Sequence, residues 1–180
     1  MNLPNKLTVL RVIMIPFFVL ALMADGGTNP AYRYAAAAIF IVASLTDMLD
    51  GKIARKYNLV TNFGKFMDPL ADKLLVCSAL ICMIELGELR AWMVIIIISR
   101  EFIISGFRLI ASDNGVVIAA SYWGKWKTTF QMIAVVLLIL NVEELSMLTT
   151  ATVWIALVLT VVSLADYIIK NIGILTEGKM

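Results

Sequence analysis

Six apolar stretches follow one another along the chain, and short polar turns rich in glycine, asparagine or proline separate most of them. Uninterrupted charge-free runs cover 12–24, 34–46, 74–84, 91–99, 128–142 and 145–165. Only the last run reaches the roughly 20 residues that carry a helix across a bilayer, so the other five need charged residues at their ends. The pattern therefore predicts six helices, at 6–24, 31–56, 66–86, 91–111, 124–142 and 146–170.

The amino-acid composition indicates that these helices lie in a membrane. Hydrophobic residues make up 61% of the 180 residues, charged residues make up 16%, and the mean hydropathy is +0.91. A soluble globular domain has about 45–50% apolar and about 25% charged residues. A chain this short cannot bury the excess apolar surface, so lipid must solvate it. We therefore predict an all-α integral membrane protein whose six helices form one domain over residues 1–180.

The basic residues predict the orientation of the helices, because cytoplasmic loops of membrane proteins carry an excess of lysine and arginine. With the N-terminus in the cytoplasm, thirteen of the 15 basic residues fall on the inner side, and only Arg33 and Arg90 fall on the outer side. We expect a multi-pass protein of the inner (cytoplasmic) membrane with both termini in the cytoplasm. Residues 1–24 are expected to stay as the first helix rather than to be removed as a secretory signal.

The same composition excludes several kinds of chemistry. The chain has no histidine, so it has no Ser-His-Asp triad and no histidine-ligated zinc site. The two cysteines, Cys77 and Cys82, lie in an apolar stretch without the spacing of a metal or disulfide motif. A net charge of +2 predicts no nucleic-acid partner. Any catalysis must use carboxylates, lysine, arginine or a metal ion held by oxygen atoms.

Four aspartates lie toward the predicted cytoplasmic ends of the second and third helices. Asp47 and Asp50 are three residues apart and Asp68 and Asp72 are four apart, so each pair shares one helix face. An aspartate at the centre of a membrane helix costs about 2.5–3.5 kcal/mol, so the four cannot all face lipid. We predict a polar cavity in which the four carboxylates converge on hard divalent cations such as Mg²⁺ or Mn²⁺.

Small residues and one arginine lie beside these acids. Gly51, Ala54 and Gly64 leave the acidic face without bulky side chains, so a ligand can approach the backbone there. Arg55 follows at once, and its fork-shaped guanidinium is suited to a phosphate. Close packing between helices is the alternative explanation for the three small residues.

From Asp47 to Asp72 the chain reads D-x2-D-G-x2-A-R-x8-G-x3-D-x3-D. This segment, which we call the acidic signature, resembles the signature of the CDP-alcohol phosphotransferase family, with every fixed position filled. Members of that family join a CDP-linked lipid or alcohol to a hydroxyl acceptor and release CMP. The resemblance implies a membrane-bound transferase of phospholipid biosynthesis, and it suggests a homodimer.

Three other stretches, at 2–11, 99–108 and 124–128, resemble one branch of that family. Members of the branch transfer the phosphatidyl group of CDP-diacylglycerol to glycerol 3-phosphate, which is the reaction we expect. The same family with another acceptor (serine, inositol phosphate or phosphatidylglycerol) is one alternative. A cation transporter or channel is another, since acids within membrane spans also mark ion pathways. Transport explains the carboxylates but neither the small residues and Arg55 nor the wholly apolar outer halves, such as 34–42.

The resemblance also implies roles for individual residues. Two divalent cations are expected on Asp47, Asp50, Asp68 and Asp72, and Asp72 is also the expected general base. The expected CDP pocket consists of Gly51, Ala54, Arg55, Gly64, Asn5 and Thr8. The cations available for the acceptor phosphate are Arg100, Arg108, Lys125 and Lys127. Asn5 and Thr8 could instead cap the first helix, and the four cations could instead extend toward lipid phosphates.

Overall fold

The computed structural model describes residues 2–56, 62–113 and 121–176, and α-helices account for most of them. Their bounds are α1 Leu3–Met23, α2 Pro30–Lys56, α3 Asn62–Glu85, α4 Ala91–Asp113, α5 Tyr122–Leu140 and α6 Ser146–Thr176. Two short 3-10 helices, Ala24–Gly27 and Glu143–Leu145, precede α2 and α6. Within the helices, side chains are described except at residues 3, 4, 48–56, 62, 63, 65, 66, 112, 113 and 172–176. The described residues thus contain the six predicted helices, of which α3 begins four residues earlier and α6 ends six residues later than predicted.

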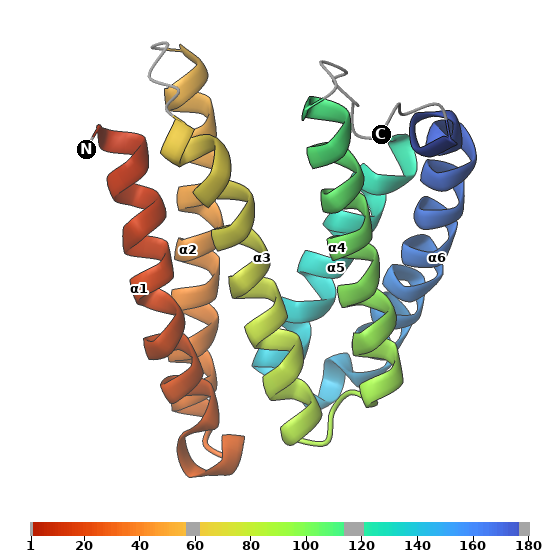
Figure 1. The fold of residues 1–180 in the computed structure, drawn as a ribbon. Helices are drawn as coiled ribbons and strands as arrows, with labels where there is room; N and C mark the ends of the chain where they lie inside the picture. Colours follow the sequence, from red (N-terminus) through yellow and green to blue (C-terminus); the bar gives the residue numbers. More distant parts are fainter. Residues whose placement is uncertain (1, 57–61, 114–120, 177–180) are drawn as a thin grey trace. The chain divides into compact units, whose positions relative to one another are not determined.

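The chain divides into two compact units. Unit 1 consists of Met1–Leu89 with Val135–Glu143, and unit 2 of Arg90–Ala134 with Glu144–Met180. In unit 1, α1 packs along both α2 and α3 (Figure 1). In unit 2, α4 packs against α6 (Figure 1). The acidic signature belongs to unit 1, and all four predicted acceptor cations belong to unit 2.

The core of unit 1 combines a few large side chains with many small ones. Phe18 of α1 and Phe40 of α2 are fully buried, with ring centroids 5.7 Å apart. Alanines fill the remaining helix contacts and are buried at Ala36, Ala37, Ala43, Ala71 and Ala79. Small residues let helix backbones approach closely, which is the usual way for membrane helices to pack.

A buried arginine joins the polar turns of unit 1. The Arg33 guanidinium, in the first turns of α2, donates hydrogen bonds to the carbonyl oxygens of Gly27 and Leu138 and forms an ion pair with Glu88. Gly27 has a φ of +69°, and a Cβ atom there would lie 2.7 Å from the Leu86 side chain, so only glycine fits without a shift. Arg33 is fourteen residues from Asp47 along α2, or roughly 21 Å at 1.5 Å per residue.

The outer surface of the helices carries large apolar side chains. Exposed fractions reach 69% for Leu20, 61% for Ile95, 86% for Met147 and 74% for Ile169. Two segments, Asn5–Gly27 and Glu143–Asn171, are long and apolar enough to cross a membrane. The described residues are thus mainly helical, expose large apolar side chains and include two candidate spans. These features agree with the prediction of a membrane protein.

Candidate active site

Two aspartates from different helices are hydrogen-bonded to α1. The Arg11 Nη1 atom donates to Oδ1 of Asp47 on α2, at 2.5 Å. The Thr8 hydroxyl donates to Oδ1 of Asp68 on α3, also at 2.5 Å. Thr8 and Arg11 are three residues apart, so they share one face of α1, and both are fully buried. This face of α1 therefore brings together acids from both halves of the acidic signature.

The rest of the signature lies around these two acids along α2 and α3. Asp72 is one helical turn after Asp68 and is exposed, whereas Gly64, one turn before Asp68, is buried. The side chains of Asp50, Gly51, Ala54 and Arg55 lie outside the described residues. Among the side chains that are described, no three acidic, cysteine or histidine groups lie close enough to hold a metal ion. The complete set of four carboxylates therefore stays a prediction.

The donor chemistry of the described acids fits a hard divalent cation. Both hydrogen bonds from α1 use the Oδ1 atoms of Asp47 and Asp68, so each carboxylate still has its Oδ2 atom to offer to a cation. Carboxylate oxygens are the ligands that Mg²⁺ and Mn²⁺ prefer. The described part of the site therefore suits the predicted cations.

The two α1 residues predicted for the CDP pocket, Asn5 and Thr8, are buried, and they lie within α1 rather than at its N-cap. Asn2 is the N-cap of α1, and its side chain accepts a hydrogen bond from the Asn5 backbone N–H at 3.1 Å. Asn5 is 7% exposed, and Thr8 contacts Asp68. The alternative that Asn5 and Thr8 cap the first helix is therefore wrong, because the helix begins before both residues. Their binding to CDP stays a prediction.

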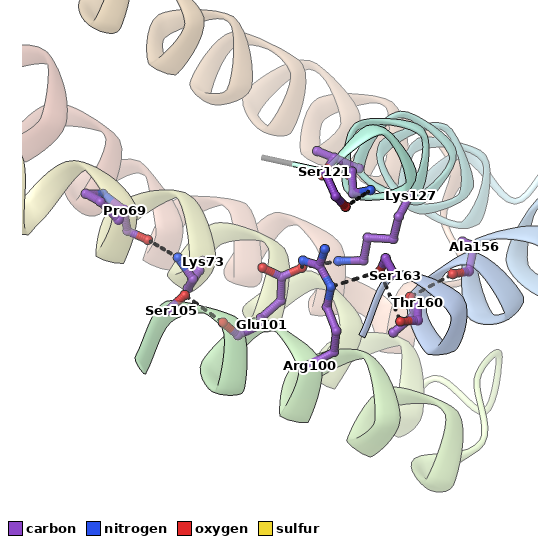
Figure 2. Close-up of polar contacts among 12 residues, drawn as sticks. Pro69, Lys73, Arg100, Glu101, Ser105, Ser121, Lys127, Ala156, Thr160 and Ser163 are labelled. Atoms are coloured by element: carbon purple, nitrogen blue, oxygen red, sulfur yellow. Dashed lines mark hydrogen bonds and ion pairs between the residues drawn. The ribbon is translucent and has the colours of Figure 1, made fainter. Parts of the chain in front are cut away.

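Unit 2 contains two buried cations that share one carboxylate. The Arg100 Nη1 atom of α4 lies 3.2 Å from Oε1 of Glu101, and the Lys127 ammonium of α5 forms an ion pair with the same oxygen. The Arg100 Nε atom donates to the Ser163 hydroxyl of α6 at 3.2 Å. Figure 2 shows these side chains pointing toward one another. We call Arg100, Glu101, Lys127 and Ser163 the cationic cluster, since its formal charges sum to plus one.

The structure separates the four predicted acceptor cations into two groups. Arg100 and Lys127 are 7% and 1% exposed and belong to the cationic cluster, whereas Arg108 and Lys125 are exposed on α4 and α5. The sequence predicted neither Arg11 nor Ser163 as a polar partner, and it did not indicate that Glu101 binds Arg100 and Lys127. The spacing of Arg11, three residues after Thr8 and six after Asn5, was the one signal that could have revealed its place on the polar face of α1.

The family model for CDP-alcohol phosphatidyltransferase matches residues 1–162. The chain belongs to this family. The match includes α1 and the whole acidic signature, as well as Arg100, Glu101 and Lys127 of the cationic cluster. The chain is therefore an enzyme of the CDP-alcohol phosphatidyltransferase class, and the family resemblance predicted from the acidic signature is confirmed.

Several relatives of known name match almost the whole chain. A CDP-diacylglycerol–glycerol-3-phosphate 3-phosphatidyltransferase of Bacillus subtilis is 46% identical, over 94% of this chain and 95% of the relative. A probable phosphatidylglycerophosphate synthase of Mycobacterium tuberculosis is 42% identical, over 96% of this chain and 84% of its own length. A CDP-diacylglycerol–glycerol-3-phosphate 3-phosphatidyltransferase of Haemophilus influenzae is 40% identical, over 93% of this chain and 91% of the relative.

Proposed function

We propose that this enzyme transfers the phosphatidyl group of CDP-diacylglycerol to glycerol 3-phosphate, giving phosphatidylglycerophosphate and CMP. The observation that carries the proposal is the 46% identity with the Bacillus subtilis enzyme of that name, which extends over 94% of this chain. The relatives from Mycobacterium tuberculosis and Haemophilus influenzae have names that agree with the same reaction. Carboxylates that could hold divalent cations and a cluster of buried cations both suit a reaction between two phosphate-containing substrates.

The proposed setting is the inner (cytoplasmic) membrane. In this proposal the two compact units together form one six-helix domain, which crosses the membrane six times and has its termini and active site on the cytoplasmic side. The distribution of basic residues supports this orientation, since thirteen of the 15 fall on the cytoplasmic side of such a layout. The acyl tails of CDP-diacylglycerol then stay in lipid while its nucleotide stays in water. A homodimer is the proposed assembly.

Asp47, Asp50, Asp68 and Asp72 are the proposed ligands of two divalent cations, Mg²⁺ or Mn²⁺. When bound, these cations neutralise charge on the pyrophosphate of the donor and on the transition state. The chain holds two of the carboxylates in place through α1, where Arg11 bonds to Asp47 and Thr8 bonds to Asp68. Gly51, Ala54, Arg55 and Gly64, with Asn5 and Thr8, form the proposed CDP pocket, in which the small residues admit the nucleotide and Arg55 contacts a phosphate.

Asp72 is the proposed general base, and its exposed position on α3 lets a substrate hydroxyl reach it. Asp72 accepts the proton of the acceptor hydroxyl while the hydroxyl oxygen forms a bond to the phosphorus of the phosphatidyl group. The bond from that phosphorus to the bridging oxygen breaks, and CMP leaves with the electron pair. The buried cations Arg100 and Lys127, with Arg108 and Lys125, are the proposed ligands of the acceptor's phosphate, and Glu101 leaves them with a net positive charge.

The test uses the purified full-length enzyme with CDP-diacylglycerol, Mg²⁺ and one candidate acceptor at a time, and it measures CMP release. We expect glycerol 3-phosphate to support at least a hundredfold higher kcat/KM than serine, inositol phosphate or phosphatidylglycerol. A preference for one of those three would replace the proposed acceptor. Absence of CMP release with every acceptor would reject the proposed reaction.

A further inference from the structure

Arg11 is the largest fully buried side chain of the described part of the protein, and nothing in the proposed reaction yet uses its charge. Among the described residues, its guanidinium bonds to α2 at two places, from Nε to the Ala43 carbonyl oxygen at 3.2 Å and from Nη1 to Oδ1 of Asp47 at 2.5 Å. Ala43 is one helical turn before Asp47, so the planar guanidinium spans that turn. Two bonds from one rigid group restrict its rotation, and the rotation of the Asp47 carboxylate is restricted with it.

We propose that Arg11 is a positioning residue for the divalent-cation site, which it serves by holding Asp47 with one oxygen bonded and the other directed to the cation. The inference rests on the proposed function, because it takes Asp47 as a cation ligand. Hydrogen-bond partners of metal ligands fix the orientation of those ligands, and removing such a partner typically weakens metal binding about 10–100-fold. Thr8 makes the corresponding bond to Asp68 from the same face of α1, so the helix holds one acid of each pair.

The positive charge of Arg11 does not by itself prevent cation binding, because the proposed site contains four carboxylates. Four aspartates and two divalent cations cancel, and the diphosphate of the donor then adds two negative charges. Arg11 and Arg55 supply two positive charges against these, and Lys73 also interacts electrostatically with Asp47. Charges with little access to water are costly unless they are compensated. The positive charge of Arg11 beside Asp47 therefore helps to stabilise the site when the divalent cations and the donor diphosphate are bound.

A purely structural role is the alternative to positioning. In that case the pair of Arg11 and Asp47 only joins α1 to α2, and its loss lowers the stability of the protein without changing its affinity for a cation. The two roles separate if stability and cation affinity are measured in the same experiment. Thermal unfolding in a series of MnCl2 concentrations does this, because a ligand raises the unfolding temperature according to its concentration relative to its dissociation constant.

Arg33 provides the matched control. Like Arg11, Arg33 is a buried arginine of unit 1 that bonds to backbone carbonyl oxygens and forms an ion pair with a carboxylate. Its contacts, however, join the turns at the opposite end of α2 from Asp47. Arg33→Met therefore removes a comparable buried pair without touching an acid of the signature. It should lower the unfolding temperature without changing the MnCl2 concentration that gives half of the maximal shift.

The experiment compares wild-type protein, Arg11→Met, Arg11→Lys and Arg33→Met, each full-length in detergent with MnCl2 alone. We expect Arg11→Met to raise the half-saturating MnCl2 concentration at least tenfold, within the range for lost partners of metal ligands. Arg11→Lys keeps a cation beside Asp47 but cannot also reach the Ala43 carbonyl oxygen, so a rise of about threefold is expected. It tests the same point if Arg11→Met does not fold.

An unchanged or lower half-saturating concentration in both Arg11 variants, with a normal shift in the wild-type protein, would overturn the inference and leave the proposed function intact. An equal rise in Arg33→Met would assign the effect to lost stability and would also overturn it. If MnCl2 and MgCl2 fail to shift the unfolding temperature of the wild-type protein, the proposed cation site itself fails, and the inference falls with it.

Discussion

In unit 1, the buried cation Arg11 forms an ion pair with Asp47 of the acidic signature, whereas in unit 2 two buried cations share the carboxylate of Glu101. Among the described side chains, α1 brings one cation, Arg11, to the acids Asp47 and Asp68, whereas the cationic cluster has two cations and one acid. Buried charges are usually paired one to one, because an unpaired charge in a medium of low dielectric constant costs several kcal/mol. We therefore compare the two groups as proposed binding sites for ligands of opposite charge.

Arg33 and Glu88 show what a balanced pair looks like in the same protein. One cation meets one acid, and backbone carbonyl oxygens accept the remaining hydrogen bonds of the guanidinium. Such a pair joins the ends of elements and leaves no charge for a ligand. The unbalanced groups are the better candidates for substrate and cation binding, and the predictions below test that difference.

The largest effect is expected from Asp72→Asn. This change removes the proposed general base and one carboxylate of the acidic excess but preserves the size of the side chain. General bases contribute about 10²–10⁴-fold, so kcat for CMP release should fall by at least a hundredfold. Binding of CDP-diacylglycerol should persist, as measured by its effect on the unfolding temperature.

Asp166→Asn is the control for this prediction. Asp166 of α6 forms an ion pair with Lys170, so it is an acid that already has a cation partner. Its replacement should change kcat by less than about twofold, because Asp166 belongs to neither the acidic signature nor the cationic cluster. If both variants lose activity equally, Asp72 has no special role.

An intermediate effect is expected from Lys127→Met. The side chain is 1% exposed and of similar length, so methionine can fill its space while removing the charge. Arg100 and Glu101 then form a neutral pair, and the positive excess of the cationic cluster disappears. The KM for glycerol 3-phosphate should rise about tenfold or more, in line with a lost charge-assisted bond of roughly 1.5–3 kcal/mol. The KM for CDP-diacylglycerol should stay within about twofold.

Gln131→Met provides the control on the same helix. Gln131 is buried one helical turn after Lys127 and is neutral, so its replacement tests the cost of changing a buried polar side chain of α5 without changing charge. We expect both KM values to remain near those of the wild-type enzyme. An equal rise of KM for both substrates in Lys127→Met would remove the acceptor role of the cationic cluster.

The helices were predictable because their signals are local. Apolar runs, turn residues and charge counts determine where a helix begins and ends, and the described helices match the predicted ones closely. The largest differences are at α3, which includes Asn62 and Gly64, and at α6, which extends to Thr176. Both extensions contain polar residues, which a search for apolar runs treats as the end of a helix.

The aspartates of the site were predictable from their spacing, but their partners were not. Asp47 and Asp68 stand out because acids are rare in apolar helices. Arg11 and Glu101 look ordinary in the sequence, since cations are expected on the inner side and acids are expected near cations. Asp47 lies 36 residues from Arg11, and Lys127 lies 26 residues from Glu101, whose other partner, Arg100, is its neighbour in the chain. Only the packing of helices against one another determines such pairs.

The smallest effect is expected from Arg108→Ala, which tests whether exposed cations share the role of the buried ones. Arg108 is exposed on α4, where water screens its charge, so its interaction with a phosphate is worth less than that of Lys127. The KM for glycerol 3-phosphate should rise about threefold, and more than the KM for CDP-diacylglycerol. Lys170→Ala is the control, because Lys170 is an exposed cation paired with Asp166. If Arg108→Ala and Lys170→Ala behave alike, the buried cations alone hold the acceptor's phosphate. Burial then distinguishes the cations that bind the acceptor from the other cations of the chain.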